Sequence, residues 1–335
     1  MAKRKRRQSP NQVVRQLGFP AMTEVGTFHS IAHLFGKSKP RCGIYLLGFS
    51  DGLFYVGQAT DVVNRFAQHR LVHGDIERFS FQKCRRNLLD ETEKRIIQKA
   101  EAKGLQLTNK VHVVNIVGDT DFDHLVLPDE QESFLVDPDG FNLADKSGRI
   151  DLPTSHRNRF RRKHKKFEEH LHSDRVSGVL GRYVHGCVPA FRRTEHAFWS
   201  MTCLPSTNSG SYRRLSCVSI NVMEVFVVGW HKEDDNFHWA VLNVSCDQLD
   251  RQFPDPDEFF RSHPGTWCEE TGYQAAGIDQ MAIHADTLPV IESLVADHRI
   301  RQAAAQLNLR LMRKGPTVYS RFHCIDLADR VLGDG

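Results

Sequence analysis

The chain has 335 residues, of which 40% are hydrophobic and 26% are charged, and its formal net charge is +4. This length favours two domains that each bury a core, and the hydrophobic fraction excludes a wholly disordered or collagen-like chain. No apolar run is long enough to span a membrane. The basic start is not followed by an apolar segment, and the eight scattered Cys form no CxxC pair. We therefore expect a cytoplasmic protein with reduced thiols and no membrane partner.

Positive charge is concentrated in two short segments. Residues 3–7 carry five Lys and Arg, residues 156–166 carry seven, and neither segment contains an acidic residue. Without these twelve charges the formal net charge would be −8. Basic segments on an acidic remainder favour contact with a polyanion, although a solvated tail and a solvated helix face are the alternative. The residues expected to contact this polyanion are Arg157, Arg159, Arg161, Arg162 and Lys163.

Changes in composition divide the chain into four parts. Residues 1–40 are basic and punctuated by Pro, which predicts a partly disordered segment, and residues 41–117 have the pattern of a compact α/β unit. Residues 118–175 are rich in Asp, Pro and Gly before the basic stretch, which predicts an extension and a linker helix. Residues 176–335 form a second domain. We expect the two halves to separate within residues 150–176.

The first unit begins with a predicted hairpin. An apolar strand over residues 42–48 is followed by Asp51-Gly52, a strong turn signal, and by a return strand over residues 53–57. Side chains alternate between the two faces of a strand, so the hairpin brings Tyr45 and Tyr55 back beside each other on one face.

A helix, a strand and a second helix are predicted to follow. Thr60 or Asp61 can cap a helix that ends near Arg70, on which Arg65 and His69 are neighbours because they are four residues apart. The pattern then predicts a strand over residues 78–84 and an amphipathic helix over residues 90–103, with Gly104 at its C-terminal end. The expected order is β-β-α-β-α, a three-stranded antiparallel sheet flanked by helices.

These elements carry a known combination of residues. Gly43-Ile44-Tyr45 and Tyr55-Val56-Gly57 resemble the signature of the GIY-YIG nuclease superfamily, with Val56 in place of the Ile of the name. Arg65 and His69 resemble the Arg-x-x-x-His helix of that family, and Glu93 lies in the helix after the third strand. Asn109 is similar to the Asn that ends the family's module. The resemblance covers residues 41–117.

The resemblance implies a DNA endonuclease that hydrolyses phosphodiester bonds with Mg²⁺ or Mn²⁺. It also implies that DNA is the polyanion that the basic residues within 157–163 bind. Its implied catalytic residues are Tyr45, Tyr55, Arg65, His69 and Glu93, whereas Gly43, Gly57 and Asn109 are structural. A carboxylate such as Glu93 suits one hard divalent cation, and the planar Arg65 guanidinium suits phosphate oxygens. The resemblance assigns Tyr45 as the base for the attacking water, which requires that a metal and Arg65 depress its pKa.

A second Glu and Asn pair imitates part of this pattern. Glu132 and Asn142 lie further along the chain, among Asp and Pro residues that favour a loop. We prefer Glu93 as the metal ligand because it follows the third strand on a predicted helix, although the interval from Arg65 to Glu93 is short. A structural zinc site, a phosphate-binding Gly loop and a GxSxG nucleophile motif are not supported by the spacing of the residues.

The second domain is predicted to be α+β, without a recognised family. The pattern predicts a near-continuous strand over residues 217–229, a turn at 232–236 and a return strand over 237–244. A short helix near residues 254–258, a strand over 279–285, helices over 287–312, a strand over 317–325 and a last helix follow. The domain contains 15 Lys and Arg against 19 Asp and Glu, so it is not a basic DNA platform overall.

We therefore expect a divalent-metal-dependent DNA endonuclease with an accessory domain, in a setting such as restriction, defence or DNA repair. One alternative is a non-catalytic DNA- or RNA-binding protein that keeps the module as a scaffold. Another is an effector nuclease tethered to a C-terminal sensing domain. The sequence does not specify the oligomeric state or the DNA specificity.

Overall fold

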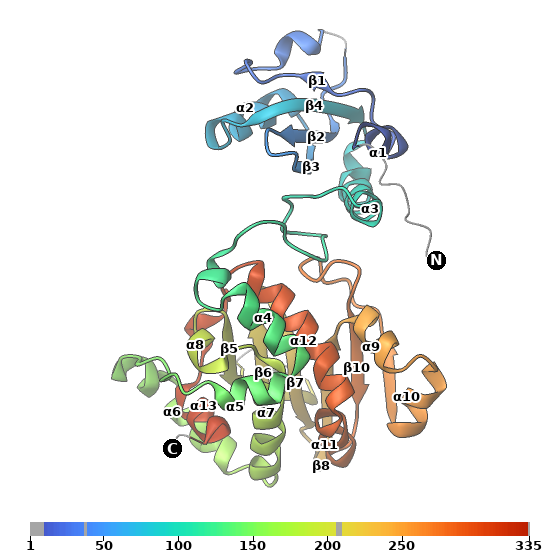
Figure 1. The fold of residues 1–335 in the computed structure, drawn as a ribbon. Coiled ribbons are helices and arrows are strands. Elements are labelled where there is room, and N and C mark those ends of the chain that lie inside the picture. Colours follow the sequence, from blue (N-terminus) through green and yellow to red (C-terminus); the bar gives the residue numbers. More distant parts are fainter. Residues whose placement is uncertain (1–9, 37–38, 206–209, 334–335) are drawn as a thin grey trace. The chain divides into compact units, whose positions relative to one another are not determined.

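The computed structural model describes residues 10–36, 39–205 and 210–333, so the basic residues 3–7 lie outside the described part. The chain divides into two compact units, Met1–Val117 and Gly118–Gly335. Each unit combines helices with its own antiparallel sheet, which confirms the predicted α+β class (Figure 1). Within the described ranges, none of the helices is both long and apolar enough to cross a membrane.

The first unit contains the predicted β-β-α-β-α order. Its elements are α1 (Pro10–Gln16), β1 (Thr23–Glu24), η1 (Ala32–Leu34), β2 (Gly43–Phe49), β3 (Phe54–Ala59), α2 (Val62–Val72), β4 (Ile76–Lys83), η2 (Arg86–Leu88) and α3 (Leu89–Ala102). The strand order is β1-β4-β2-β3, and every neighbouring pair is antiparallel. The sheet therefore has a fourth strand beyond the three that the sequence predicts. β1 pairs through only two residues, too few for an alternating pattern to be visible in the sequence.

Local signals in the sequence explain where these elements begin and end. Gly52 has a positive φ of 86° in the turn between β2 and β3, a conformation that suits glycine. The Asp61 side chain accepts hydrogen bonds from the backbone N–H groups of Val63 and Asn64, at 2.9 and 3.2 Å, and so caps α2. Gly104 also has a positive φ, of 77°, just beyond the end of α3.

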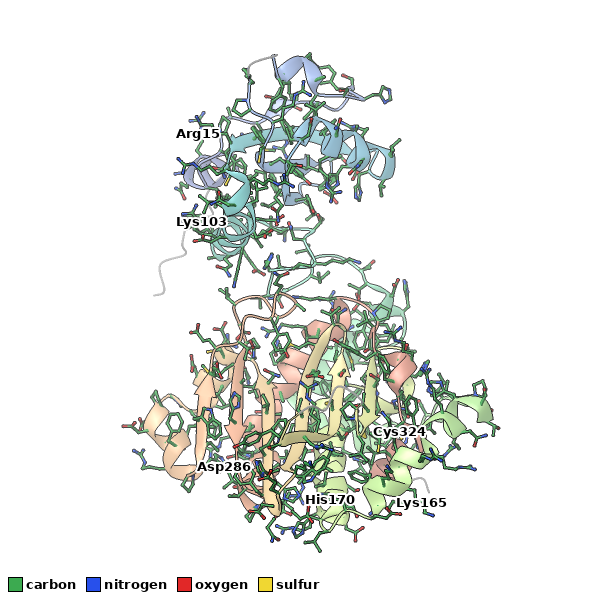
Figure 2. All side chains as sticks on the ribbon, turned by 180° about the vertical axis from the view of Figure 1, so that it is seen from behind. Arg15, Lys103, Lys165, His170, Asp286 and Cys324 are labelled. Carbon is green, nitrogen blue, oxygen red and sulfur yellow. The ribbon has the colours of Figure 1, made fainter. Side chains whose placement is uncertain are left out.

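Two apolar clusters cover the two faces of this sheet. One contains Ile44, Val56 and Ile97 and joins β2 and β3 to α1 and α3. The other contains Leu47, Phe66 and Phe79 and joins the sheet to α2 and to residues 25–35. In Figure 2, Arg15 and Lys103 lie near each other, and the Lys103 ammonium donates to Gln16 on α1 at 2.7 Å.

Residues 10–36 therefore belong to the folded first unit, which corrects the division at residue 40. Val13 and Val14 on α1 are buried against the sheet, as are Val25 and Ile31 after it. The prolines that suggest an irregular segment stand at the start of α1 and in the loop after it, but the apolar residues between them supply part of the core.

The second unit contains a six-stranded sheet. Its elements are η3 (Asp121–His124), α4 (Pro128–Val136), α5 (Pro138–Ala144), α6 (Thr154–Glu168), α7 (Ser173–Cys187), α8 (Phe191–Thr194), β5 (Trp199–Cys203), β6 (Tyr212–Ile220), β7 (Met223–His231), β8 (Asp234–Val244), α9 (Cys246–Gln252), α10 (Pro256–Ser262), β9 (Thr266–Glu269), β10 (Met281–Ala285), α11 (Leu288–Ala296), α12 (His298–Arg313), η4 (Ser320–Phe322) and α13 (Ile325–Leu332). The strand order is β5-β6-β7-β8-β10-β9, and α7, α11 and α12 lie against one face of the sheet (Figure 1).

The domain boundary and two strands in this part of the chain require correction. The predicted linker of residues 118–175 is part of the second unit, because Phe122, Phe160 and Phe167 are buried in its core. The predicted strand over 217–229 is two strands, β6 and β7, joined by a tight turn at Asn221, whose φ is 52°. The predicted strand over 317–325 is a turn of 3₁₀ helix, η4. The strand at 279–285 and the helices within 287–312 are confirmed.

Candidate active site

The candidate site lies at the edge strand β3. Residues 106–109 run beside the first half of this strand, where the Asn109 side chain forms two hydrogen bonds with the backbone of Val56. The Asn109 amide donates to the Val56 carbonyl at 2.7 Å, and the Val56 N–H donates to the Asn109 carbonyl oxygen at 3.0 Å. Asn109 is buried, and it satisfies edge groups that would otherwise lack partners. It thereby fixes the strand between Tyr55 and Gly57.

The two tyrosines lie on one face of the sheet, close to each other. In the antiparallel register Tyr45 is opposite Gly57 and Leu47 is opposite Tyr55, so the tyrosines are diagonal neighbours with ring centroids 6.1 Å apart. A Cβ atom at Gly57 would lie 2.4 Å from the Tyr45 hydroxyl oxygen. The missing side chain at Gly57 thus lets the Tyr45 ring lie across β3 and bring its hydroxyl to the sheet edge.

Helix α2 brings two polar groups to the Tyr45 hydroxyl. The hydroxyl oxygen is 2.7 Å from Nε2 of His69 and 3.4 Å from Nε of Arg65. A guanidinium can only donate, so the tyrosine oxygen accepts from Arg65. When the neutral His69 ring carries its proton on Nδ1, the Tyr45 hydroxyl donates its own proton to Nε2 of His69.

The pKa shifts of His69 and Tyr45 are consistent with this hydrogen-bond direction. Burial lowers the pKa of His69 to about 4, with the nearby Arg65 and His73 contributing in the same direction, so its imidazole is neutral at pH 7. Burial raises the pKa of Tyr45, and the neighbouring Tyr55 adds to this effect, while Arg65 opposes it. Tyr45 is only 1% exposed. Arg65 therefore lowers the Tyr45 pKa, as expected from the sequence, but burial raises this pKa by more and the net shift is upward.

Tyr55 is half-buried and lies between the same helix and the sheet. Its ring centroid is 5.1 Å from that of His69. Burial raises the pKa of Tyr55, the charge of Glu93 raises it further, and Arg65 lowers it. The electrostatic influence of both Glu93 and Arg65 on this hydroxyl shows that the five predicted catalytic residues lie in one neighbourhood.

Glu93 reaches the sheet edge from α3 through a glutamine. Gln58 follows Gly57 on β3, and its amide nitrogen donates to Glu93 at 2.9 Å and to Asp90 at 2.5 Å. Burial raises the pKa of Glu93, the hydrogen bond from Gln58 lowers it, and the charge of Asp90 raises it. Because β3 is an edge strand, groups from both faces of the sheet meet around it: the tyrosines from one face and the Gln58–Glu93 pair from the other.

The residues present are compatible with a hard divalent cation. Glu93 and Asp90 lie three residues apart on one face of α3, and their carboxylate oxygens are the ligand type that Mg²⁺ prefers. Within residues 10–36, 39–205 and 210–333, no three or more His, Cys, Asp or Glu side chains are grouped to hold a metal ion. Mg²⁺ typically keeps several waters and binds one or two carboxylates together with substrate phosphate, so two carboxylates fit it.

The predicted DNA-binding residues of the basic segment lie on α6, in the second unit. Arg157 is bonded to Asp326 at 2.7 Å and to Asp329 at 2.5 Å. Arg159 donates to the Arg321 carbonyl at 3.2 Å. Arg161 and Arg162 are exposed, Lys163 is half-buried, and the labelled Lys165 is exposed on the same helix (Figure 2). Part of the basic segment therefore attaches α6 to its own unit, and only part of it faces solvent.

The alternative Glu and Asn pair belongs to a different environment. Glu132 is exposed on α4, which corrects the expectation of a loop: Pro128 occupies the first turn of this helix, where proline is well tolerated. The buried Asn142 bonds the carbonyls of His185 and Val188 and the N–H of Ala190. Both residues lie in the second unit, and Asn142 serves its packing.

Sequence reasoning missed two residues of this site, Gln58 and Asp90. Each has a signal in the sequence: Gln58 directly follows Tyr55-Val56-Gly57, and Asp90 is one helical turn before Glu93. The chain matches no known family, no curated protein and no solved structure in the comparisons. Function is therefore inferred from the residues and their geometry.

Proposed function

We propose that the first unit is a DNA endonuclease that depends on a divalent metal ion and hydrolyses phosphodiester bonds at the edge of β3. The observation that carries this proposal is the Tyr45 hydroxyl, held between a permanent donor, Arg65, and a neutral acceptor, His69. Few structural roles require a tyrosine hydroxyl with this pair of partners beside a half-buried carboxylate. A base for water, a cation for the phosphate and a carboxylate for a metal ion together suit the hydrolysis of a phosphodiester.

In the proposed mechanism Tyr45 and His69 together remove a proton from the attacking water. The raised pKa of Tyr45 means that a free tyrosinate does not accumulate at neutral pH. Tyr45 therefore accepts a proton from the attacking water as its own proton passes to Nε2 of His69. A concerted transfer of this kind uses the 2.7 Å hydrogen bond that is already formed.

Arg65 and Glu93 have separate roles in the proposal. Arg65 is exposed, so its guanidinium can bind the non-bridging oxygens of an incoming phosphate while it still contacts Tyr45. Glu93, with Asp90 beside it, would hold Mg²⁺ or Mn²⁺. When bound, this ion would neutralise charge on the phosphate and the leaving oxygen. Gln58 positions Glu93 against β3.

A plasmid-nicking assay tests this proposal. The full-length protein is expected to convert supercoiled DNA to nicked or linear DNA with Mg²⁺ and to lose this activity with a chelator. Tyr45→Phe keeps the ring over Gly57 and removes the hydroxyl, so it should reduce cleavage by roughly a hundredfold. Glu132→Gln, in the second unit, is the control and should leave cleavage unchanged. Cleavage by Tyr45→Phe at the wild-type rate would contradict the role of the hydroxyl.

A non-catalytic nucleic-acid-binding protein is the second candidate. One observation favours it: the proposed catalytic tyrosine is 1% exposed and its pKa is raised, which also describes a structural tyrosine. Binding of DNA without any metal-dependent cleavage in the same assay would support this candidate over the nuclease.

A further inference from the structure

The first unit contains a pocket that the proposed catalysis does not use. Its volume is about 390 Å³, which is within the usual range for small-ligand sites. It lies at the outer side of β4, next to the short strand β1 and the residues that follow η1. The side chains that define its chemistry are Leu34, Phe35, Phe79, Phe81, Lys39 and Lys83.

The pocket opens on the same face of the sheet as the tyrosines. In the register of β2 and β4, Phe81 is directly opposite Tyr45, Phe79 is opposite Leu47 and Lys83 is opposite Gly43. Neighbouring strands are about 4.8 Å apart, so the pocket begins one strand away from Tyr45. A Cβ atom at Gly43 would lie 2.8 Å from the Phe81 ring, so the absence of a side chain there leaves space for that ring beside Tyr45.

The pocket combines aromatic walls with positive charge at its rim. The Phe35 ring packs edge-on against the Phe81 ring, with centroids 5.2 Å apart, and against the Phe79 ring at 6.3 Å. Lys39 and Lys83 are exposed, and none of the described residues that line the pocket is acidic. The Lys39 ammonium donates to the Leu34 carbonyl at 3.2 Å, and an ammonium has three donors in total, so it can also bind a ligand.

This combination matches the two parts of a nucleotide. A planar base has π-faces that stack on aromatic rings, and its phosphate carries the negative charge that lysines bind. A purely apolar ligand would not use the two ammonium groups. A phosphate alone would not use the phenylalanines.

We propose that this phenylalanine pocket binds one unpaired base of the DNA strand, next to the phosphate that is cleaved at Tyr45. The inference rests on the proposed function and specifies its substrate. Phe81 forms the stacking surface nearest the site, and Lys39 and Lys83 contact the flanking phosphates. A base must leave its stack to enter the pocket, at a cost that is smallest where it is already unpaired. The protein therefore prefers DNA with a bulged, mismatched or single-stranded nucleotide over a fully paired duplex.

The test compares two DNA duplexes that differ in one nucleotide. One carries a single bulged 2-aminopurine, whose fluorescence depends on its stacking with neighbouring bases, and the other is fully paired. The full-length protein is titrated without added metal, so that binding is measured without cleavage. We expect the fluorescence of the bulged probe to change as its base leaves the DNA stack, and we expect at least about fivefold tighter binding to it than to the paired duplex.

Variants of the pocket residues test whether the pocket causes the preference for the bulged duplex. Phe81→Leu keeps apolar bulk but removes the ring, and it should abolish the fluorescence change and the preference for the bulge, whereas Phe81→Trp should keep both. The double change of Lys39→Ala and Lys83→Ala alters two exposed residues. It should weaken binding to both duplexes and lower the log–log salt slope by about 0.9 for each phosphate that is no longer neutralised. Lys99→Ala, at an exposed position on α3, is the matched control and should change nothing.

Separate outcomes identify which inference fails. If the wild-type protein cleaves plasmid DNA with Mg²⁺ but binds both duplexes equally, the pocket proposal is overturned and the nuclease remains. If the fluorescence change depends on Phe81 but no cleavage occurs under any metal condition, the pocket is supported and the nuclease is overturned. Failure of the wild-type protein to bind either duplex overturns the pocket proposal, and failure to cleave plasmid DNA with Mg²⁺ overturns the nuclease.

Discussion

Arg65 in the first unit is exposed and donates to a tyrosine hydroxyl and a glutamine side-chain oxygen, whereas Arg149 in the second unit is nearly buried and bonds two carboxylates. Two Arg149 nitrogens bond Glu195 at 2.8 Å, and a third bonds Asp329 at 2.7 Å. His323, fully buried, completes this network through a 2.9 Å contact with Glu195. Both clusters contain an Arg, a His and a Glu, but the environment of each group differs.

The difference separates groups that hold a fold from groups that are available for chemistry. In the second unit, burial alone would raise the pKa of Glu195, but its bonds to Arg149 and His323 lower it to about 2. In the first unit, burial raises the pKa of Glu93, and its hydrogen bond comes from a neutral amide. A carboxylate whose hydrogen-bond partner is neutral is suited to accept a cation from outside, whereas one that is fully paired with cations is not.

The largest effect predicted by this comparison is on stability. Glu195→Ala leaves the nearly buried Arg149 and the buried His323 without their main partner, so the free energy of unfolding of the second unit should fall by about 3–5 kcal/mol. All four Trp lie in this unit, so chemical denaturation followed by Trp fluorescence reports on it specifically. Glu292→Ala breaks the exposed pair with Arg175 and should cost at most about 1 kcal/mol. Equal effects of the two changes would contradict the distinction.

Arg65→Lys should have the next largest effect, and it should appear in activity. An ammonium cannot reproduce the planar donor group that contacts Tyr45 and a phosphate together, so cleavage should fall at least about tenfold, or about 1.4 kcal/mol. The stability of the first unit should hardly change, because Arg65 is exposed. Arg95→Lys, exposed on α3, is the matched control. If the Arg65→Lys variant unfolds readily, Arg65 has a structural role like that of Arg149 instead.

A smaller effect is expected in the pH dependence of stability. The pKa of His69 is about 4 in the folded protein and about 6.5 in an unfolded chain, so between these values the unfolded state binds more protons. The contribution of neutral His69 to the free energy of unfolding is therefore complete above about pH 6.5 and is lost as the pH falls toward 4.

The first unit by itself can be used to measure this effect. Its apolar clusters close within residues 10–117, so a chain of residues 1–117 is suitable. His69→Gln should lose less stability than the wild type between pH 7 and pH 5, measured by denaturation followed by circular dichroism. Equal losses would show that His69 is not held neutral.

The smallest effects concern the basic helix α6. Arg161 and Arg162 are exposed, and if they contact DNA their neutralisation should lower the log–log salt slope of DNA binding by about 0.9 each. Arg157→Ala should instead lower the stability of the second unit, because Arg157 is bonded to Asp326 and Asp329. A salt slope that is unchanged after both exposed arginines are neutralised would show that α6 does not contact DNA.

Much of the first unit can be predicted from its sequence because its signals are local. Asp51-Gly52 specifies a turn, Asp61 specifies a helix start, and each acts within a few residues of its own position. The spatial meeting of Tyr45 with Arg65 and His69 follows from strand and helix periodicity together with the resemblance. The Gln58 bridge to Glu93 cannot be predicted in this way, because it depends on how closely α3 approaches the edge of β3.

The second unit is less predictable because its decisive contacts are distant in sequence. Glu195 and His323 are separated by 128 residues, and no local pattern indicates that they meet. The β6–β7 turn lies inside an apolar run, where Asn221 takes a left-handed conformation without a Gly or Pro to mark it. Pro128 begins α4 although it also suits a loop, since proline at a helix start and proline in a loop have the same local sequence signature.

The most direct test of the central claim is the single-turnover cleavage rate of full-length Glu93→Gln with Mg²⁺, compared with the wild type and with Glu91→Gln. Glu91 is exposed two residues away on the same helix and does not share the Gln58 bridge, so it matches Glu93 in charge and element. We predict that Glu93→Gln cleaves at least about a hundredfold more slowly, a loss of roughly 3 kcal/mol of transition-state stabilisation, with unchanged folding and DNA affinity. Glu91→Gln should cleave at the wild-type rate. Wild-type cleavage by Glu93→Gln would contradict the assignment of the metal-binding carboxylate and, with it, the proposed active site.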